Sequence, residues 1–132
     1  MNIHHSIIRQ LIQHAQADAP VEACGYLAEK DDIITAVFRM KNADNSPEHF
    51  SFEPAEQFAA ARQMRAAGLR LRAVYHSHPA TPARPSQEDI RLAYDPALSY
   101  VIVSLAGARP DVKSFRIRDG QVAVEPLQII ED

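Results

Sequence analysis

The stretch YHSHPATPARPSQED, residues 75–89, constrains the fold of this chain more than any other part of the sequence. Residues 69–78, which overlap its start, first alternate between apolar and charged side chains and then become strand-like, which predicts a β-strand. The prolines that follow lack the N–H group that a strand needs, so the strand ends and a stiff loop begins. Ser86 and Asp89 then have the spacing of a capping box, which predicts that a helix starts there. A strand, a loop and a helix are therefore joined in quick succession.

The two histidines at the end of this strand can act together. Successive side chains of a strand point to opposite faces, so His76 and His78 share one face, with Cα atoms roughly 7 Å apart. Imidazoles at this spacing can converge on one metal ion, at about 2.0–2.1 Å each. Ser77 faces the other way, so the metal hypothesis places no demand on it. A His-x-His pair alone is common and is weak evidence for a metal site.

Asp89 can supply a third ligand. The capping box alone accounts for Ser86 and Asp89, because such a cap is worth about 1 kcal/mol. An acidic residue in the first turn nevertheless lies beside the start of the helix, which follows closely on the histidine strand. We therefore expect His76, His78 and Asp89 to be able to meet at one ion. Two histidines and a carboxylate leave a fourth tetrahedral position for water, as in catalytic zinc sites.

The apolar pattern elsewhere predicts an α/β (α+β) fold, with one mixed central sheet and helices packed on it. The length suits a single domain, which we expect to span residues 1–132. Gly68 predicts the end of the second helix, and Asp119-Gly120 predicts the turn of a closing hairpin. The expected helices cover residues 3–17, 54–67 and 86–94, and the expected strands cover 24–30, 33–40, 49–52, 69–78, 100–105, 112–118 and 121–130.

Composition excludes several classes of function. A net charge of -3 gives no electrostatic footprint for nucleic acid or for an anionic membrane. Cys24 is the one cysteine, so no intrachain disulfide can form and nothing implies an oxidising compartment. Among the first residues, His4, His5 and Arg9 interrupt the apolar run, unlike in the core of a signal peptide. No run of the chain approaches the roughly 18 apolar residues of a membrane span. We expect a cytoplasmic protein that binds neither nucleic acid nor membrane.

The histidine and aspartate pattern resembles the signature of the JAMM (MPN+) zinc metalloprotease family, in particular its compact prokaryotic members. That signature is His-x-His, then seven residues beginning with proline, then Ser-x-x-Asp. Residues 76–89 agree with it in every spacing. The family also has a glutamate shortly before a Cys-Gly-hydrophobic strand. VEACGYLAE, residues 21–29, matches that element and places Glu22 at the glutamate position.

The resemblance implies a mechanism and a substrate. His76, His78 and Asp89 would bind zinc. Ser86 would steady the tetrahedral intermediate or the bound water, and Glu22 would be the general base and then the proton donor. Family members hydrolyse the bond after the diglycine tail of ubiquitin or a ubiquitin-like protein. The resemblance therefore implies a zinc-dependent (iso)peptidase acting on a ubiquitin-like sulfur-carrier protein or its conjugate, with an architecture similar to that of cytidine deaminases.

Several alternatives stay open beside this interpretation. Spacing alone does not single out Glu22 as the base; the other candidates are Glu29, Glu48, Glu53 and Glu88. The rival function is a non-catalytic MPN module that scaffolds a complex, although such modules typically lack the ligands that this chain has. Cys24 could be a thiol nucleophile, but a free cysteine is more often a buried core residue. A zinc deaminase would need a Pro-Cys-x-x-Cys motif, which a single cysteine excludes.

Overall fold

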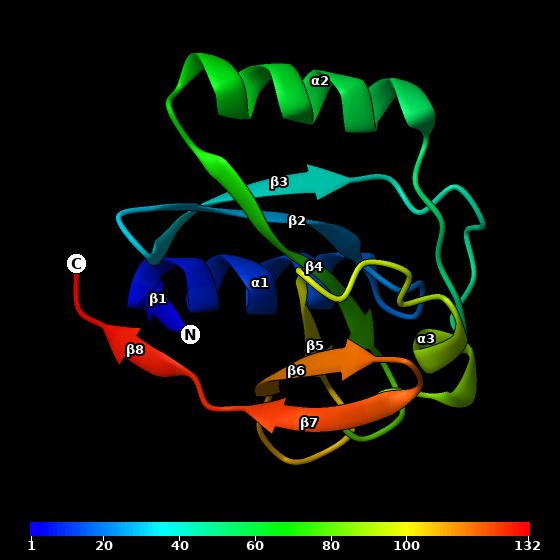
Figure 1. Cartoon of the computed structure of the whole chain (residues 1–132). Coiled ribbons are helices and arrows are strands. Elements are labelled where there is room, and N and C mark those ends of the chain that lie inside the picture. Colours follow the sequence, from blue (N-terminus) through cyan, green and yellow to red (C-terminus); the bar gives the residue numbers. More distant parts are fainter.

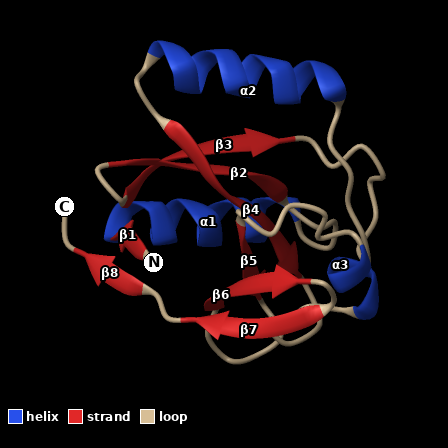
Figure 2. Ribbon diagram, viewed as in Figure 1, coloured by secondary structure: helices blue, strands red, loops and turns tan.

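An eight-stranded mixed sheet forms the centre of the molecule (Figure 1; Figure 2). The computed structural model describes all residues, 1–132. The strands run in the order β7-β6-β5-β4-β2-β3-β1-β8 across the sheet. Their bounds are β1 (Asn2–His4), β2 (Cys24–Lys30), β3 (Ile33–Met40), β4 (Arg70–His78), β5 (Ser99–Ser104), β6 (Asp111–Arg118), β7 (Gln121–Glu125) and β8 (Gln128–Ile130). The helices are α1 (His5–Asp18), α2 (Pro54–Ala66) and α3 (Gln87–Arg91).

The sheet is mixed, as predicted. β4 and β5 run parallel, and β1 runs parallel to both β3 and β8, whereas the other pairs are antiparallel. The histidine strand β4 lies in the interior of the sheet, with β2 on one side and β5 on the other. Its His76 stands opposite Cys24 of β2 and Ile102 of β5. Both neighbours fix the end of β4, so its last side chains have defined positions.

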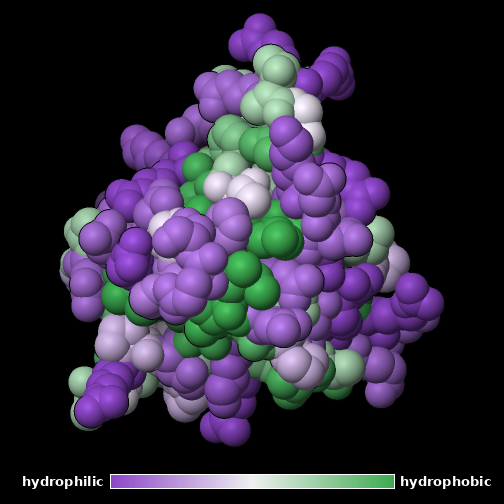
Figure 3. Space-filling model, turned by 90° about the vertical axis from the view of Figure 1, so that its left-hand side faces the viewer, coloured by the Kyte–Doolittle hydropathy of each residue, from purple (hydrophilic) through white to green (hydrophobic).

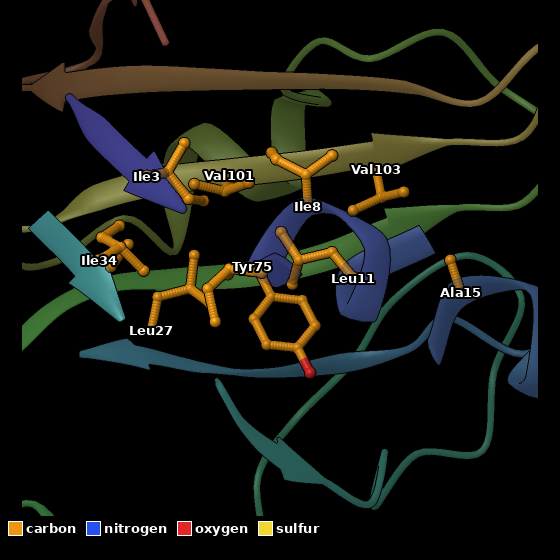
Figure 4. Close-up of a cluster of buried hydrophobic side chains, with 11 residues drawn as sticks. Ile3, Ile8, Leu11, Ala15, Leu27, Ile34, Tyr75, Val101 and Val103 are labelled. Atoms are coloured by element: carbon orange, nitrogen blue, oxygen red, sulfur yellow. The ribbon is translucent and has the colours of Figure 1, made fainter. Parts of the chain in front are cut away.

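Helices cover the two faces of the sheet, so alternate side chains of β4 face different helices. α1 buries Ile8 and Leu11 against a cluster that includes Tyr75 (Figure 4). α2 covers the opposite face through a second cluster, which includes Cys24 and Met64. Because strand side chains alternate, Tyr75 and Ser77 belong to the α1 face, while His76 and His78 belong to the other face.

A buried polar contact joins α1 to β4 on this face of the sheet. His14 of α1 is only 5% exposed, and its Nδ1 lies 2.7 Å from the hydroxyl of Tyr75. Gly25 of β2 lies directly against the same tyrosine. A Cβ at Gly25 would come within 2.4 Å of the Phe38 carbonyl oxygen and 2.6 Å of the Tyr75 ring, so only glycine fits. The Cys-Gly pair therefore has a packing requirement of its own.

The structure corrects four boundaries of the sequence prediction. Residues 2–4 form β1, because pairing with β3 and β8 there prevails over the helical periodicity. Residues 49–52 form no strand; Phe50 and Phe52 pack against the α2 cluster without a ladder of hydrogen bonds. α3 ends at Arg91 rather than at residue 94.

The fourth correction concerns the C-terminal segment. The turn at Asp119 and Gly120 has φ values of 49° and 75°, as a tight hairpin turn requires, so the predicted hairpin β6–β7 is confirmed. Residues 121–130 do not continue as one strand, however. Pro126 follows β7, and the chain crosses to the opposite edge of the sheet, where β8 pairs with β1.

The surface is mostly hydrophilic. Figure 3 shows one face on which polar side chains surround a central apolar patch. The large hydrophobic side chains that are exposed on the whole molecule are Phe58, Leu92, Tyr94, Val122, Val124 and Ile129. None of the three helices has both the length and the apolar character needed to cross a bilayer.

Candidate active site

Three donor atoms meet where β4 ends and α3 begins. The Nε2 atoms of His76 and His78 are 3.1 Å apart. The Oδ2 atom of Asp89 lies 3.2 Å from the first and 3.1 Å from the second. The structure therefore brings together the three predicted ligands in a nearly equilateral triangle of donor atoms.

The triangle fits a tetrahedral metal ion. Ligands at about 2.0–2.1 Å from a tetrahedral ion are separated by about 3.3–3.4 Å, and the observed edges are only slightly shorter. Both histidines are 5% exposed. No other group of at least three histidine, cysteine or acidic side chains in the chain has this arrangement. Imidazole and carboxylate donors are those that zinc commonly takes in proteins.

His78 is held in the tautomer that a metal ligand needs. Its Nδ1 lies 2.9 Å from the carbonyl oxygen of Pro82, so Nδ1–H donates to that oxygen and Nε2 is left as the ring atom that can bind a metal. Burial by itself would lower the pKa of His78, but the hydrogen bonds to Asp89 and to the Pro82 carbonyl outweigh burial and raise it. The proline-rich loop thus orients a ligand as well as joining two elements.

Asp89 has two functions in the structure. The Oγ of Ser86 accepts a hydrogen bond from the N–H of Asp89 at 3.0 Å, and Oδ2 of Asp89 accepts one from the N–H of Ser86 at 2.9 Å. The predicted capping box is therefore present. Burial alone would raise the pKa of the Asp89 carboxyl, but its contacts with His76 and His78 and the Ser86 N–H hold that pKa far below its usual range. Oδ2 of Asp89, which completes the capping box, is also the oxygen that faces the two histidines.

An aromatic side chain forms a wall beside the donor atoms. Phe50 stacks on the ring of His76, with ring centroids 4.7 Å apart and an interplanar angle of 25°. A cleft of about 350 Å³ opens next to His76 and Asp89. Its lining is largely apolar and aromatic and includes Phe50, Phe52, Tyr94 and Tyr100. The donor group is thus reachable from a cleft that can hold part of a peptide.

Glu22 is a buried carboxyl group beside the donor triangle. It is 3% exposed, and its Oε1 is buried without a hydrogen-bond partner. Burial, the largest influence, raises the pKa of Glu22 to about 8. The charge of His78 opposes this rise and the charge of Asp89 adds to it, so the electrostatics of Glu22 are coupled to both residues. A carboxyl with such a pKa can gain or lose a proton near neutral pH, as general acid–base catalysis requires.

The other candidate residues have different surroundings. Glu29 forms ion pairs with Arg70 and Arg72. Glu88 lies 3.7 Å from Arg91, while Glu48 and Glu53 are exposed. Cys24 is fully buried in the α2 cluster, and burial raises the pKa of its thiol to about 12, which is opposite to what a thiol nucleophile needs.

Two residues near Glu22 were not singled out by the sequence. Asn42 donates from Nδ2 to the carbonyl oxygen of Glu22 at 3.1 Å. Ser77, which the metal hypothesis left unconstrained, is fully buried and accepts a hydrogen bond from the N–H of Ala23. Neither residue has a spacing motif, because each contact joins segments that are distant in the sequence.

The fold and the site define a class: an α+β protein with a buried carboxyl group and a group of three donor atoms that is compatible with a metal ion. Residues 4–118 match the family described as prokaryotic homologs of the JAB domain. The chain belongs to this family, which confirms the resemblance drawn from residues 76–89.

Individual relatives agree over nearly the whole chain. A CysO-cysteine peptidase of Mycobacterium tuberculosis is 38% identical over 98% of this chain and 90% of its own length. A probable TtuB-protein conjugate cleaving protease of Thermus thermophilus is 30% identical over 90% of this chain and 77% of its own. The solution structure of a Desulfitobacterium hafniense protein superimposes with a TM-score of 0.92 and 43% identity, covering 99% of this chain and 93% of that one.

Proposed function

We propose that this protein is a zinc-dependent peptidase that hydrolyses the bond after the C-terminal tail of a ubiquitin-like sulfur-carrier protein. The observation that carries the proposal is the donor triangle of His76, His78 and Asp89 beside the buried carboxyl of Glu22. Two relatives support the substrate class, since one is named for CysO-cysteine and the other for TtuB–protein conjugates.

The three ligands would hold zinc through Nε2 of both histidines and Oδ2 of Asp89. A zinc ion, when bound, supplies a Lewis acid that acidifies water and polarises a carbonyl group. The chain's own part is to keep the donors in place. The Pro82 carbonyl keeps the Nδ1 proton on His78, and the Ser86 N–H fixes the carboxylate of Asp89.

Glu22 would handle the proton of the reaction. Its carboxylate takes a proton from the attacking water, and the resulting carboxylic acid then gives it to the leaving amine. In the metal-free chain the pKa of Glu22 is raised to about 8. A bound cation would lower it, so the carboxylate that the first half of this task needs would be available at neutral pH. The buried surroundings of Glu22 also limit the bulk water that could take the proton instead.

Ser86 would contribute a hydrogen bond to the reacting group. Its Oγ already accepts from the Asp89 N–H, so its hydroxyl proton is the part left for donation. A donor at this place can steady negative charge that develops on the substrate oxygen. The same serine caps α3, so its replacement would affect both the charge stabilisation and the position of Asp89.

The cleft fits an extended tail. Its aromatic lining offers apolar contact to the chain, and main-chain hydrogen bonds along a peptide demand little of the side chains. We therefore infer that a diglycine tail enters beside Phe50 and His76 and places its last carbonyl at the donor triangle. The leaving group is an amine, either of an amino acid or of a lysine side chain.

Cleavage assays would test the proposal. Carrier proteins that end in diglycine, linked to cysteine or to a lysine side chain, would be incubated with wild-type protein and with Glu22→Gln and His78→Gln. We expect wild-type cleavage after the second glycine, a zinc content near one per chain, and loss of activity in both variants. Only His78→Gln should lose zinc. Zinc-free wild-type protein that cannot be activated by added zinc would instead support a scaffold.

A further inference from the structure

The position of Glu22 is set by its backbone. Glu22 lies two residues before β2, outside the regular ladder of the sheet. Its Oε1 has no hydrogen-bond partner, so that atom does not anchor the side chain. Three bonds hold the backbone there instead: the Glu22 N–H donates to the Ser46 carbonyl at 2.9 Å, Asn42 donates to the Glu22 carbonyl, and the Ala23 N–H donates to Oγ of Ser77 at 2.8 Å.

Ser77 is the member of this set that also belongs to the ligand strand. It lies between His76 and His78, and its own N–H donates to the Ala23 carbonyl at 2.9 Å. Two hydrogen bonds therefore join residue 77 to residue 23, one from the backbone and one through the side chain. The hydroxyl occupies the place that a backbone carbonyl would take in a regular antiparallel pair. Ser77 thus links the strand that carries both histidines directly to the residue that follows Glu22.

The chemistry explains why such a connection matters. A base must be within hydrogen-bond reach of the proton that it takes, and a shift of about 1 Å can reduce a rate on the order of 100-fold. Ser77 is fully buried on the α1 face and cannot contact the substrate. Any effect that it has on the reaction is therefore transmitted either through Ala23 to Glu22 or through its neighbours His76 and His78, and zinc affinity distinguishes the two routes.

We propose that Ser77 is a positioning residue, whose hydroxyl sets the distance of Glu22 from the ligand pair through the N–H of Ala23. The proposal rests on the proposed function for its kinetic consequence, but its structural part can be tested without activity. Asn42 assists from the other side, because its amide fixes the carbonyl of the same Glu22.

The test compares serine variants that differ in one group. Ser77→Ala removes the hydroxyl, and Ser77→Thr and Ser77→Val form an isosteric pair in which only threonine keeps it. Ser114→Ala is the matched control. Ser114 lies on β6, is also fully buried, and donates a hydrogen bond from Oγ to Glu125 at 2.8 Å. Each variant would be measured for kcat and KM, for zinc affinity, and for the NMR signal of the Glu22 carboxyl carbon in metal-free protein.

We expect kcat to fall roughly 10-fold to 100-fold in Ser77→Ala, with KM and zinc affinity close to wild type. The Glu22 carboxyl signal should move in the same variant. Ser77→Thr should be clearly more active than Ser77→Val, and Ser114→Ala should resemble wild type in every measurement. Equal activity of the threonine and valine variants, or an equal loss in Ser114→Ala, would overturn the proposal.

The two hypotheses fail in different ways. If wild-type protein cleaves no carrier substrate, the proposed function fails, and the NMR comparison alone decides the role of Ser77. A Glu22 carboxyl signal that moves in Ser77→Ala but not in Ser114→Ala then supports positioning. An unchanged signal in Ser77→Ala overturns it.

Discussion

Replacing Glu22 with glutamine should make the metal-free protein more stable at neutral pH. Glutamine has nearly the shape of a protonated glutamate but cannot ionise. Burial raises the pKa of Glu22 from 4.5 to about 8, so the folded chain holds a proton that the unfolded chain releases. The stability linked to this proton is fully present below pH 4.5 and is lost as the pH rises toward 8.

The magnitude follows from the width of that pH interval. Each pH unit between the two pKa values is worth about 1.4 kcal/mol. At pH 7, about 2.5 units above the unfolded pKa, the wild-type protein has lost about 3 kcal/mol of unfolding free energy that Glu22→Gln keeps. At pH 5 the difference should be below about 1 kcal/mol, because the pH is then only slightly above the unfolded pKa and the unfolded glutamate is only partly ionised.

Urea unfolding in the presence of a chelator would measure this difference at pH 5 and pH 7. The chelator is needed because a bound cation would itself lower the pKa of a nearby carboxyl. Glu88→Gln is the control, since it removes a negative charge near the site from a side chain that is 41% exposed. Unfolding free energies of Glu22→Gln and wild type that change in parallel from pH 5 to pH 7 would refute the buried, protonated state of Glu22.

Three further outcomes are expected. Tyr75→Phe should cost about 1–3 kcal/mol in urea unfolding, because Nδ1 of buried His14 loses the hydroxyl that lies 2.7 Å away; a cost below 0.5 kcal/mol would contradict this view of the contact. Burial opposes a low pKa of Glu125, but hydrogen bonds from Ser99, Ser114 and Arg72 lower it, so its stabilising effect is present above its unfolded pKa and lost as the pH falls. Glu125→Gln should therefore be less stable than wild type at pH 7, with a gap that closes in acid, as thermal unfolding at several pH values would reveal. A chelator should abolish cleavage and zinc should restore it; activity that persists at undetectable zinc content would argue against the mechanism.

The ligand group could be predicted because it is local in sequence. His76, His78 and Asp89 are joined by one strand end, one loop and one helix start, and each of these has its own sequence signal. Glu22 lies far from them in sequence and depends on the register of β2 against β4, which no local pattern specifies. Only the resemblance to a family, rather than spacing, singled out Glu22, and its role as the base stays a prediction.

The errors in the predicted fold have the same origin. β1 is short and exists through pairing with β3 and β8, so its residues carry no strand signal of their own. The crossing of β8 to the far edge of the sheet depends on the free edge of β1, with which β8 pairs. The sequence of residues 121–130 contains no sign of that edge. Ser77 shows the same limit at the level of one side chain, because its partner Ala23 is defined only by the tertiary structure.

Oδ2 of Asp89 takes part both in the cap of α3 and in the group of three donor atoms. The folding of α3 and the binding of a metal ion at this oxygen would therefore be coupled. α3 has five residues, too few to be stable by themselves, and depends on its cap. An ion bound through Oδ2 stabilises only chains in which the cap is formed, so its binding free energy is also free energy for folding α3. By reciprocity, any partner that orders this short helix tightens the hold on the ion, and one that unwinds it releases the ion.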